Sequence, residues 1–171
     1  SNSSKASSGI NASNSLNQQK NKIIDDNNIF YKDTLKSSKR NNEPYTILIN
    51  KLVNNSSNAI EWLKSKDINL NSIAILGGHT NPRTHRPDTN VLVGIEIISK
   101  LSNYIKKYNN LTILTNCSVI NFLKDNDDVI GVTYEDLNKN RHKLYSNFTI
   151  LTSGGYGNDH SKLSLINKHR P

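Results

Sequence analysis

The sequence predicts an α/β fold with a mixed sheet, because helical and strand patterns occupy different parts of the chain. Residues 44–64 and 88–107 carry apolar side chains at three- and four-residue steps, the periodicity of an amphipathic helix. The β-rich runs are residues 111–115, 118–123, 129–134 and 143–153. Polar turns separate the last three runs, so we expect an antiparallel meander near the C-terminus.

The region before the first long helix is polar. Residues 2–12 are small, turn-forming residues that can wrap closely around a flat or phosphorylated ligand. Residues 13–28 are also rich in turn formers, and we interpret them as a surface excursion. Residues 29–35 can begin a short helix.

Each long helix has an expected start and an apolar face. Pro44 suits the first turn of the first helix. Asp88, Thr89 or Asn90 can cap the second helix, and its last turn carries two lysines that favour the negative end of the helix dipole. The apolar faces comprise Ile49, Leu52, Val53, Ala59, Ile60 and Leu63 in the first helix, and Val91, Ile95, Ile98, Leu101 and Ile105 in the second.

Composition limits the function classes. The 171 residues suffice for one domain with a core. The net charge of +8 is scattered, which favours a solvated surface over a nucleic-acid or anionic-membrane interface. The single cysteine, Cys117, excludes an internal disulfide framework and lies in an apolar stretch typical of a buried thiol. No run is long and apolar enough to span a membrane.

Three glycine-bearing loops are candidate ligand contacts. They are residues 2–12, 76–87 and 152–155, and each can approach a phosphate closely or form a plain turn. The second loop holds the densest ionisable cluster, which is suited either to binding an anion or to holding the loop in place. That cluster comprises His79, Arg83, His85 and Arg86. A metal site is not expected, because no carboxylate or cysteine accompanies the histidines at ligand spacing.

The order of these motifs resembles the soluble fumarate reductase family of FAD-dependent flavoproteins. The motifs are residues 5–12 (KASSGINA), 76–86 (LGGHTNPRTHR) and 152–159 (TSGGYGND), with residues 33–37, 58–63 and 129–136 as further landmarks. The resemblance covers essentially the whole chain. It implies an FAD-binding domain of the glutathione-reductase type and a dicarboxylate substrate for the parent protein, with no nucleic-acid partner.

The resemblance also implies which residues contact FAD. The candidate cofactor-binding residues are Asn2, Ser3, Ser7, Ser8, Gly9, Val119, Ser153 and Gly154. Asn2 falls where membrane-bound relatives carry the histidine linked covalently to FAD, so we expect non-covalent binding. Val119 matches a backbone contact to the adenine. The second loop, in this comparison, is a structural loop near the flavin.

The resemblance assigns no catalytic residue to this chain. The chain has no methionine, and we expect residues 1–171 to be an internal part of an FAD-binding domain. In the family, the dinucleotide fingerprint lies upstream, and the substrate-binding histidines and proton-donating arginine lie downstream. The chain alone is therefore expected to be inactive. Two alternatives remain open: an FAD-dependent relative of the aspartate oxidase or ketosteroid dehydrogenase type, and a non-catalytic FAD-binding fragment. Compartment, cytoplasmic or mitochondrial in the family, and electron donor stay undetermined.

Overall fold

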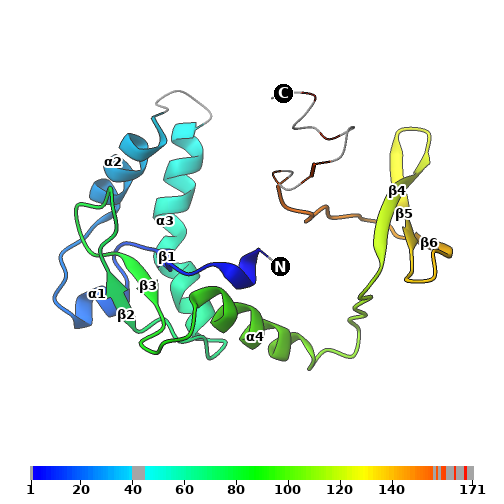
Figure 1. Ribbon diagram of the computed structural model, residues 1–171. Coiled ribbons are helices and arrows are strands. Elements are labelled where there is room, and N and C mark those ends of the chain that lie inside the picture. The colour runs from blue at the N-terminus through cyan, green and yellow to red at the C-terminus, as the bar shows by residue number, and fades with distance from the viewer. Residues whose placement is uncertain are drawn as a thin grey trace. The chain divides into compact units, whose positions relative to one another are not determined.

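The chain forms two compact units, Ser1–Leu111 and Thr112–Pro171, and each is described by itself. The computed structural model describes residues 2–39, 45–155, 157, 159, 160, 164 and 168. Figure 1 shows the helices of the first unit and the strands of the second. Pro44, predicted in the first turn of a helix, lies outside the described residues.

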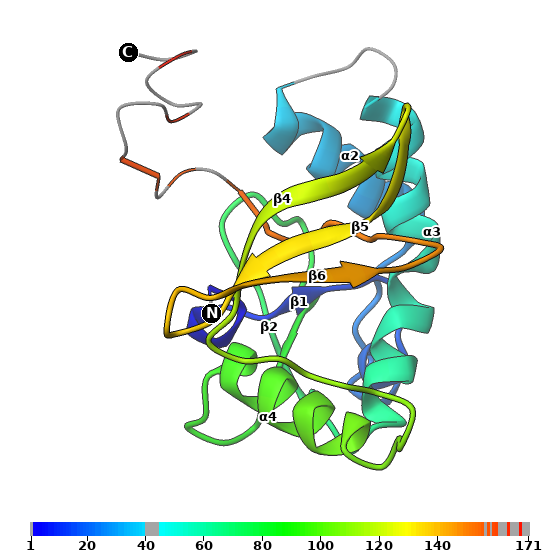
Figure 2. The ribbon, with the colours of Figure 1, turned by 90° about the vertical axis from the view of Figure 1, so that its right-hand side faces the viewer.

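Helices dominate the first unit. They are η1 (Ser3–Lys5), α1 (Leu16–Lys20), α2 (Asn27–Ser38), α3 (Tyr45–Lys64) and α4 (Val93–Ile105). Helix α2 is longer than the short helix that the sequence predicts, because the Asp26 carboxylate accepts the backbone N–H of Ile29 and caps it two residues earlier. Helix α2 packs beside α3, as both views show (Figures 1 and 2).

A small antiparallel sheet accompanies these helices. Strand β3 (Thr84–Arg86) lies between β1 (Ile10–Asn11) and β2 (Ser72–Ala74). Ile10 and Ile73 both pair with His85 in this register. The opening segment is therefore joined directly to the loop that carries the ionisable cluster, although the two are far apart in sequence.

Two apolar clusters form the core of the first unit. One consists of Ala12, Ile60, Ile68, Leu70 and Val93, and the other of Phe30, Ile49 and Val53. Ile49, Val53 and Ile60 confirm the predicted buried face of α3. Leu52 and Ala59, predicted on the same face, are exposed, and the buried position between them is Ser56. The buried stripe is thus narrower than the pattern of apolar residues.

The start of α4 differs from the prediction. Asp88, Thr89 and Asn90 do not cap this helix; its N-cap is Leu92, which makes no side-chain cap hydrogen bond. The backbone carbonyl of Ala6 instead accepts the N–H of Gly94 at 2.9 Å. A carbonyl from the opening segment therefore replaces the side-chain cap, and η1 packs against this end of α4.

Residues 13–28 do not form the surface excursion that their polarity suggests. Ser13, Ser15, Asn17, Gln18 and Asp25 are all buried. Their polar atoms are paired inside the unit, as in the capping box of α1, where the Ser15 hydroxyl accepts the Gln18 N–H and the Gln18 side chain accepts the Ser15 N–H. Buried polar groups are tolerated when they are hydrogen-bonded in this way.

The second unit contains one antiparallel sheet with its strands in chain order. The strands are β4 (Ser118–Asp125), β5 (Asp128–Glu135) and β6 (Arg141–Tyr145). Tight connections at the two predicted polar turns join them, and the β4–β5 register is irregular near Ile120. Gly131 has a φ of +153°, and an added Cβ there would meet the carbonyl oxygen of Leu144, so this close pairing with β6 requires glycine.

One strand prediction is wrong and another is only partly right. Residues 111–115 form no strand, and of the predicted run 143–153 only residues 143–145 belong to a strand, β6. Neither 111–115 nor 147–153 pairs with a strand among the described residues. Both described sheets are antiparallel, so the parallel part of the expected mixed sheet is not found in the described residues. Cys117 is half-buried, not fully buried as its apolar surroundings suggest.

Candidate functional site

The opening segment, residues 2–11, presents exposed backbone between two anchored ends. Asn2, Ser3, Ser7 and Ser8 are exposed, and Gly9 is half-buried. Ser7 and Ser8 form no hydrogen bond with another described residue, through either backbone or side chain. Free N–H groups in a surface segment are suited to contacting a ligand's polar atoms.

Gly9 anchors the C-terminal side of this exposed stretch. Its φ is +139°, a conformation that side chains rarely adopt. A Cβ built on Gly9 would lie 2.6 Å from both the carbonyl oxygen of His85 and the Cγ2 atom of Thr84. The family resemblance implies that this glycine contacts FAD, and the structure shows that pairing of the segment with β3 already requires a glycine here.

Gly94 anchors the N-terminal side. An added Cβ there would meet the Ser3 carbonyl oxygen and would lie 2.9 Å from the Ala6 backbone nitrogen. Together with the hydrogen bond from Gly94 to the Ala6 carbonyl, this close approach fixes η1 on the first turn of α4. The exposed residues Ser7 and Ser8 are therefore held between two rigid contacts.

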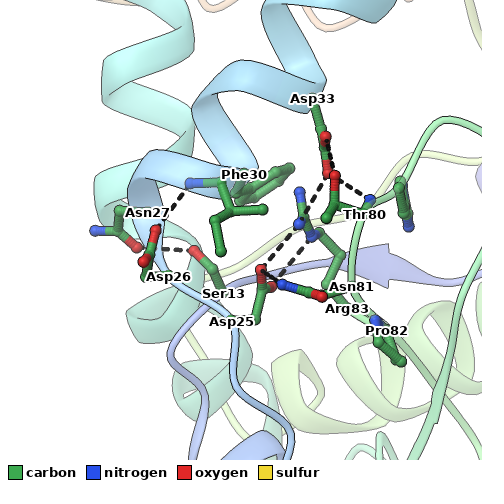
Figure 3. Close-up of polar contacts among 12 residues, drawn as sticks. Ser13, Asp25, Asp26, Asn27, Phe30, Asp33, Thr80, Asn81, Pro82 and Arg83 are labelled. Atoms are coloured by element: carbon green, nitrogen blue, oxygen red, sulfur yellow. Dashed lines mark hydrogen bonds and ion pairs between the residues drawn. The ribbon is translucent and has the colours of Figure 1, made fainter.

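Behind the opening segment lies a buried ionic cluster centred on Arg83. The Arg83 Nε and Nη2 atoms donate to the two carboxylate oxygens of Asp25 at 3.1 and 2.9 Å, and Nη2 also lies 3.0 Å from Asp33. Figure 3 shows the guanidinium between these two carboxylates. The Arg83 guanidinium lies 4.7 Å from the centre of the Phe30 ring. Two carboxylates thus neutralise one fully buried arginine.

Thr80 completes the pairing of Asp33. Its backbone N–H and its hydroxyl each donate to Asp33 at 2.7 Å (Figure 3). Burial raises the pKa of the Asp33 carboxyl, but these two hydrogen bonds and the charge of Arg83 outweigh it, so the pKa lies below its usual value. Asp33 is therefore a fixed carboxylate that holds the loop before β3 against α2.

His85 is buried next to this cluster in its neutral form. Its Nδ1 lies 2.9 Å from the Arg83 carbonyl oxygen, and its Nε2 lies 2.7 Å from the Ser15 hydroxyl. The tautomer with a proton on Nδ1 satisfies both contacts, because Ser15 then donates to Nε2. Burial lowers the pKa of His85 below its usual value, against backbone hydrogen bonds that favour the charged ring.

A cavity of about 540 Å³ opens between the opening segment, α2, α3 and the loop before β3. Its lining includes Gly9, Asn11, Gly77, His79 and Arg83. The Arg83 Nη1 and His79 Nδ1 atoms are buried and have no hydrogen-bond partner among the described residues. A buried donor left unpaired costs about 1–3 kcal/mol, and neither atom has appreciable surface open to the cavity.

The ionisable cluster that the sequence singles out is divided by the structure. Arg83 and His85 are fully buried, His79 lines the cavity, and Arg86 is exposed on β3. Sequence reasoning missed Asp25 and Asp33 as the partners of Arg83, because nothing in their spacing connects them. The only sequence signal is that Asp33 begins one of the recurrent landmarks and Arg83 belongs to another.

The remaining candidate cofactor residues lie in the second unit. Val119 is exposed on β4, an edge strand of its described sheet, next to the irregular register at Ile120. Ser153 and Gly154 are exposed, and Gly154 has a φ of +79° with no atom within 4 Å of an added Cβ. Val119 pairs with Tyr134 of β5, whereas Ser153 and Gly154 belong to no strand.

Other kinds of site find no support in the described part of the chain. Among the described residues, no group of three or more histidine, cysteine, aspartate or glutamate side chains could hold a metal ion. None of the described helices has the length and apolar character needed to cross a membrane.

A comparison with family models identifies the domain family of this chain. The family model described as "FAD binding domain" matches residues 1–171. The chain belongs to this FAD-binding domain family. The membership confirms the predicted resemblance to FAD-dependent flavoproteins.

Curated relatives are fumarate reductases. "Fumarate reductase 1" of Saccharomyces cerevisiae is 38% identical over 162 residues, which cover 91% of this chain and 34% of that protein. "NADH:fumarate oxidoreductase" of Klebsiella pneumoniae is 34% identical over 167 residues, 98% of this chain and 17% of that protein. The chain therefore spans about a third or less of the length of these relatives.

Two solved structures resemble this chain. The open conformation of a flavocytochrome c3 fumarate reductase matches with a TM-score of 0.83 and 28% identity, over 91% of this chain and 27% of that one. A 3-ketosteroid-Δ4-(5α)-dehydrogenase from Rhodococcus jostii RHA1 matches with a TM-score of 0.71 over 84% of this chain and 36% of that one. The identity to the dehydrogenase is 12%, so that likeness shows a shared fold alone.

Proposed function

We propose that this chain forms part of the FAD-binding domain of an oxidoreductase that reduces fumarate to succinate. The observation that carries the proposal is the 38% identity to a yeast fumarate reductase across 91% of the chain. FAD supplies the hydride for such a reduction. The residues of this chain bind and orient the cofactor, and none of them is assigned to the substrate or to proton delivery.

The exposed backbone of Ser7 and Ser8 supports the proposed cofactor contacts. Ser7 and Ser8 offer exposed backbone groups without partners among the described residues, and anchors on both sides fix their conformation. The full proposed set is Asn2, Ser3, Ser7, Ser8 and Gly9 in the first unit, and Val119, Ser153 and Gly154 in the second. The Asn2 amide cannot form the covalent link that a histidine forms, which supports non-covalent binding.

The activity is tested on the full-length protein under anaerobic conditions. We expect fumarate to oxidise a reduced viologen dye in the presence of the protein. L-Aspartate and a 3-ketosteroid, assayed as electron donors to the same preparation, distinguish the aspartate oxidase and ketosteroid dehydrogenase alternatives. Turnover of either compound without turnover of fumarate would reject the fumarate assignment. The chain of residues 1–171 alone is expected to show no turnover.

The opening segment is tested separately with a bulky substitution. Ser8→Trp in the full-length protein should lower the flavin content at least tenfold, because the side chain occupies the surface that the cofactor approaches. Ser102→Trp, at an exposed position of α4, is the matched control and should keep its flavin. Full flavin content in Ser8→Trp would remove the opening segment from the FAD site while leaving FAD binding by the protein intact.

A further inference from the structure

We propose that the C-terminal ends of α3 and α4, with the residues that directly follow them, form a docking surface for a partner protein. The partner binds through an acidic segment that also carries an apolar side chain. This Lys66 patch lies in the first unit and consists of Trp62, Lys66, Tyr104, Lys107 and Tyr108. The inference goes beyond the proposed cofactor chemistry and does not depend on it.

The ammonium group of Lys66 is held between aromatic rings from both helices. Its Nζ atom lies 4.4 Å from the centre of the Tyr104 ring and 5.8 Å from the centre of the Trp62 ring. The same atom donates to the Tyr104 hydroxyl at 3.1 Å. A cation within about 6 Å of a ring centre is attracted to the π-electrons of that ring. Lys66 therefore ties the end of α3 to the end of α4.

Tyr108 extends this arrangement beyond α4. Its hydroxyl oxygen lies 2.9 Å from that of Tyr104, and the two ring centres are 5.7 Å apart at an interplanar angle of 63°. This edge-to-face geometry is a favourable one for aromatic pairs. The Lys107 Nζ atom lies 5.5 Å from the centre of the Tyr104 ring. The side chains are thus arranged before any partner arrives, and an arranged surface loses less conformational freedom on binding.

The aromatic side chains of the patch are open to solvent. Trp62, the only tryptophan of the chain, is 54% exposed, and Tyr108 is 48% exposed. The contacts of α3 and α4 with the core are made by other positions, among them Ile60 and Val93. Tryptophan and tyrosine are the residue types that most often dominate the binding energy of protein interfaces. Packing of this unit therefore leaves free a surface of the composition typical of such interfaces.

Charge indicates an acidic partner. Residues 62–67 and 104–108 together contain four lysines, against Asp67 as their one acidic residue. An ammonium group has three N–H donors, and Lys66 uses one of them on a described residue. A carboxylate of the partner can accept from the remaining donors and carries the complementary charge. An apolar side chain next to that carboxylate would cover the exposed face of Trp62.

Two other occupants fit the patch less well. A membrane-bound surface inserts apolar side chains among the lipids, whereas the phenol groups of Tyr104 and Tyr108 are bonded to each other and to Lys66. A nucleic acid needs a row of cations that follows its phosphates, whereas the positive charge of this chain is scattered. A protein segment requires only the local combination of carboxylate and apolar group that this patch complements.

The test uses the full-length protein and a short fluorescein-labelled peptide composed of glutamates around one leucine. The matched peptide has glutamine in place of every glutamate. We expect fluorescence anisotropy to show binding of the acidic peptide, and binding of the glutamine peptide at least about tenfold weaker. Added sodium chloride should weaken binding of the acidic peptide, because salt screens charges on the surface.

Two variants locate the binding surface. Trp62→Gln removes the apolar contact, and Lys66→Gln removes the central charge. Each should weaken binding of the acidic peptide at least about fivefold. Tyr145→Gln, at a position of β6 that is 64% exposed, and Lys32→Gln, at an exposed position of α2, are the matched controls and should bind as the unaltered protein does. The thermal midpoint of each variant shows whether the fold is retained.

Several results would overturn the proposal. It is wrong if the unaltered protein does not bind the acidic peptide, or if it binds both peptides equally. It is also wrong if folded Trp62→Gln and Lys66→Gln proteins bind as the controls do. Phosphatidylserine vesicles and a labelled oligothymidylate test the other occupants. Tighter binding of either one than of the acidic peptide, lost in Trp62→Gln, would replace the protein partner with a membrane or a nucleic acid. None of these results alters the FAD assignment, which flavin content tests separately.

Discussion

Gly9→Ala should destabilise the first unit even without any cofactor. Its φ of +139° lies in a region that is nearly restricted to glycine, and adopting it costs about 1–3 kcal/mol for another residue. The added Cβ would also lie 2.6 Å from the His85 carbonyl oxygen, and such overpacking costs about 1–3 kcal/mol. Together these terms predict a loss of about 2–6 kcal/mol in the free energy of unfolding.

Urea denaturation of the full-length apoprotein, with and without excess FAD, measures this loss. Gly77→Ala is the matched control, because its added Cβ meets no atom within 4 Å and the effect should stay within about 0.5 kcal/mol. A loss below about 1 kcal/mol for Gly9→Ala would refute the argument from β1–β3 packing. A loss seen only with FAD present would show that Gly9 is required for cofactor binding and not for β1–β3 packing. Gly9→Val, the more drastic change, should abolish flavin binding through the same packing defect.

Three further predictions follow from the buried polar groups and the opening segment. Arg83→Met should lower the free energy of unfolding by about 3–5 kcal/mol, because Asp25 is left as an uncompensated buried charge. Combining Arg83→Met with Asp25→Asn should recover part of that loss in the same denaturation assay. The folded-state pKa of His85 lies below its unfolded value of about 6.5, so the unfolded chain takes up a proton first as the pH falls. The free energy of unfolding should therefore decline below about pH 6.5 relative to its value at pH 8. For this group the decline is at most about 1.4 kcal/mol per pH unit. His85→Gln should remove that part of the decline, and an unchanged pH profile would contradict a neutral buried ring. Acid denaturation of the holoprotein followed by filtration should release the flavin, and flavin retained on the polypeptide would contradict the role assigned to Asn2.

The sequence predicts the two long helices α3 and α4 because their apolar residues recur at helical steps, whereas α1 lies in a polar stretch that the pattern does not reveal. Ile49, Val53 and Ile60 recur along α3 at helical steps, and all three are buried. The strand at residues 111–115 is predicted by composition, but a strand also needs a partner, and the partner is a tertiary property. The burial of Gln18 and Asp25 cannot be predicted from the sequence for a similar reason. A polar residue is expected to be exposed unless its hydrogen-bond partners, which lie far away in the sequence, are known.

The candidate site also has one part that local sequence predicts and one part that depends on long-range contacts. The run of small residues at 2–12 indicates a ligand-contacting segment from its composition alone. The cavity behind it needs Asp33 of α2 and Arg83 of the loop before β3 to meet, and no local pattern encodes that meeting. The unpartnered donors are visible only when every other hydrogen bond of the cluster has been assigned.

The cap of α4 has a consequence for the order in which the protein assembles. The Ala6 carbonyl that completes α4 is synthesised long before the helix that uses it. Until Gly94 has emerged from the ribosome, the opening segment lacks one of its two anchors, and until β3 has emerged it lacks the other. Because such contacts of large sequence separation form late, the opening segment of the nascent chain becomes rigid only after α4 has been made.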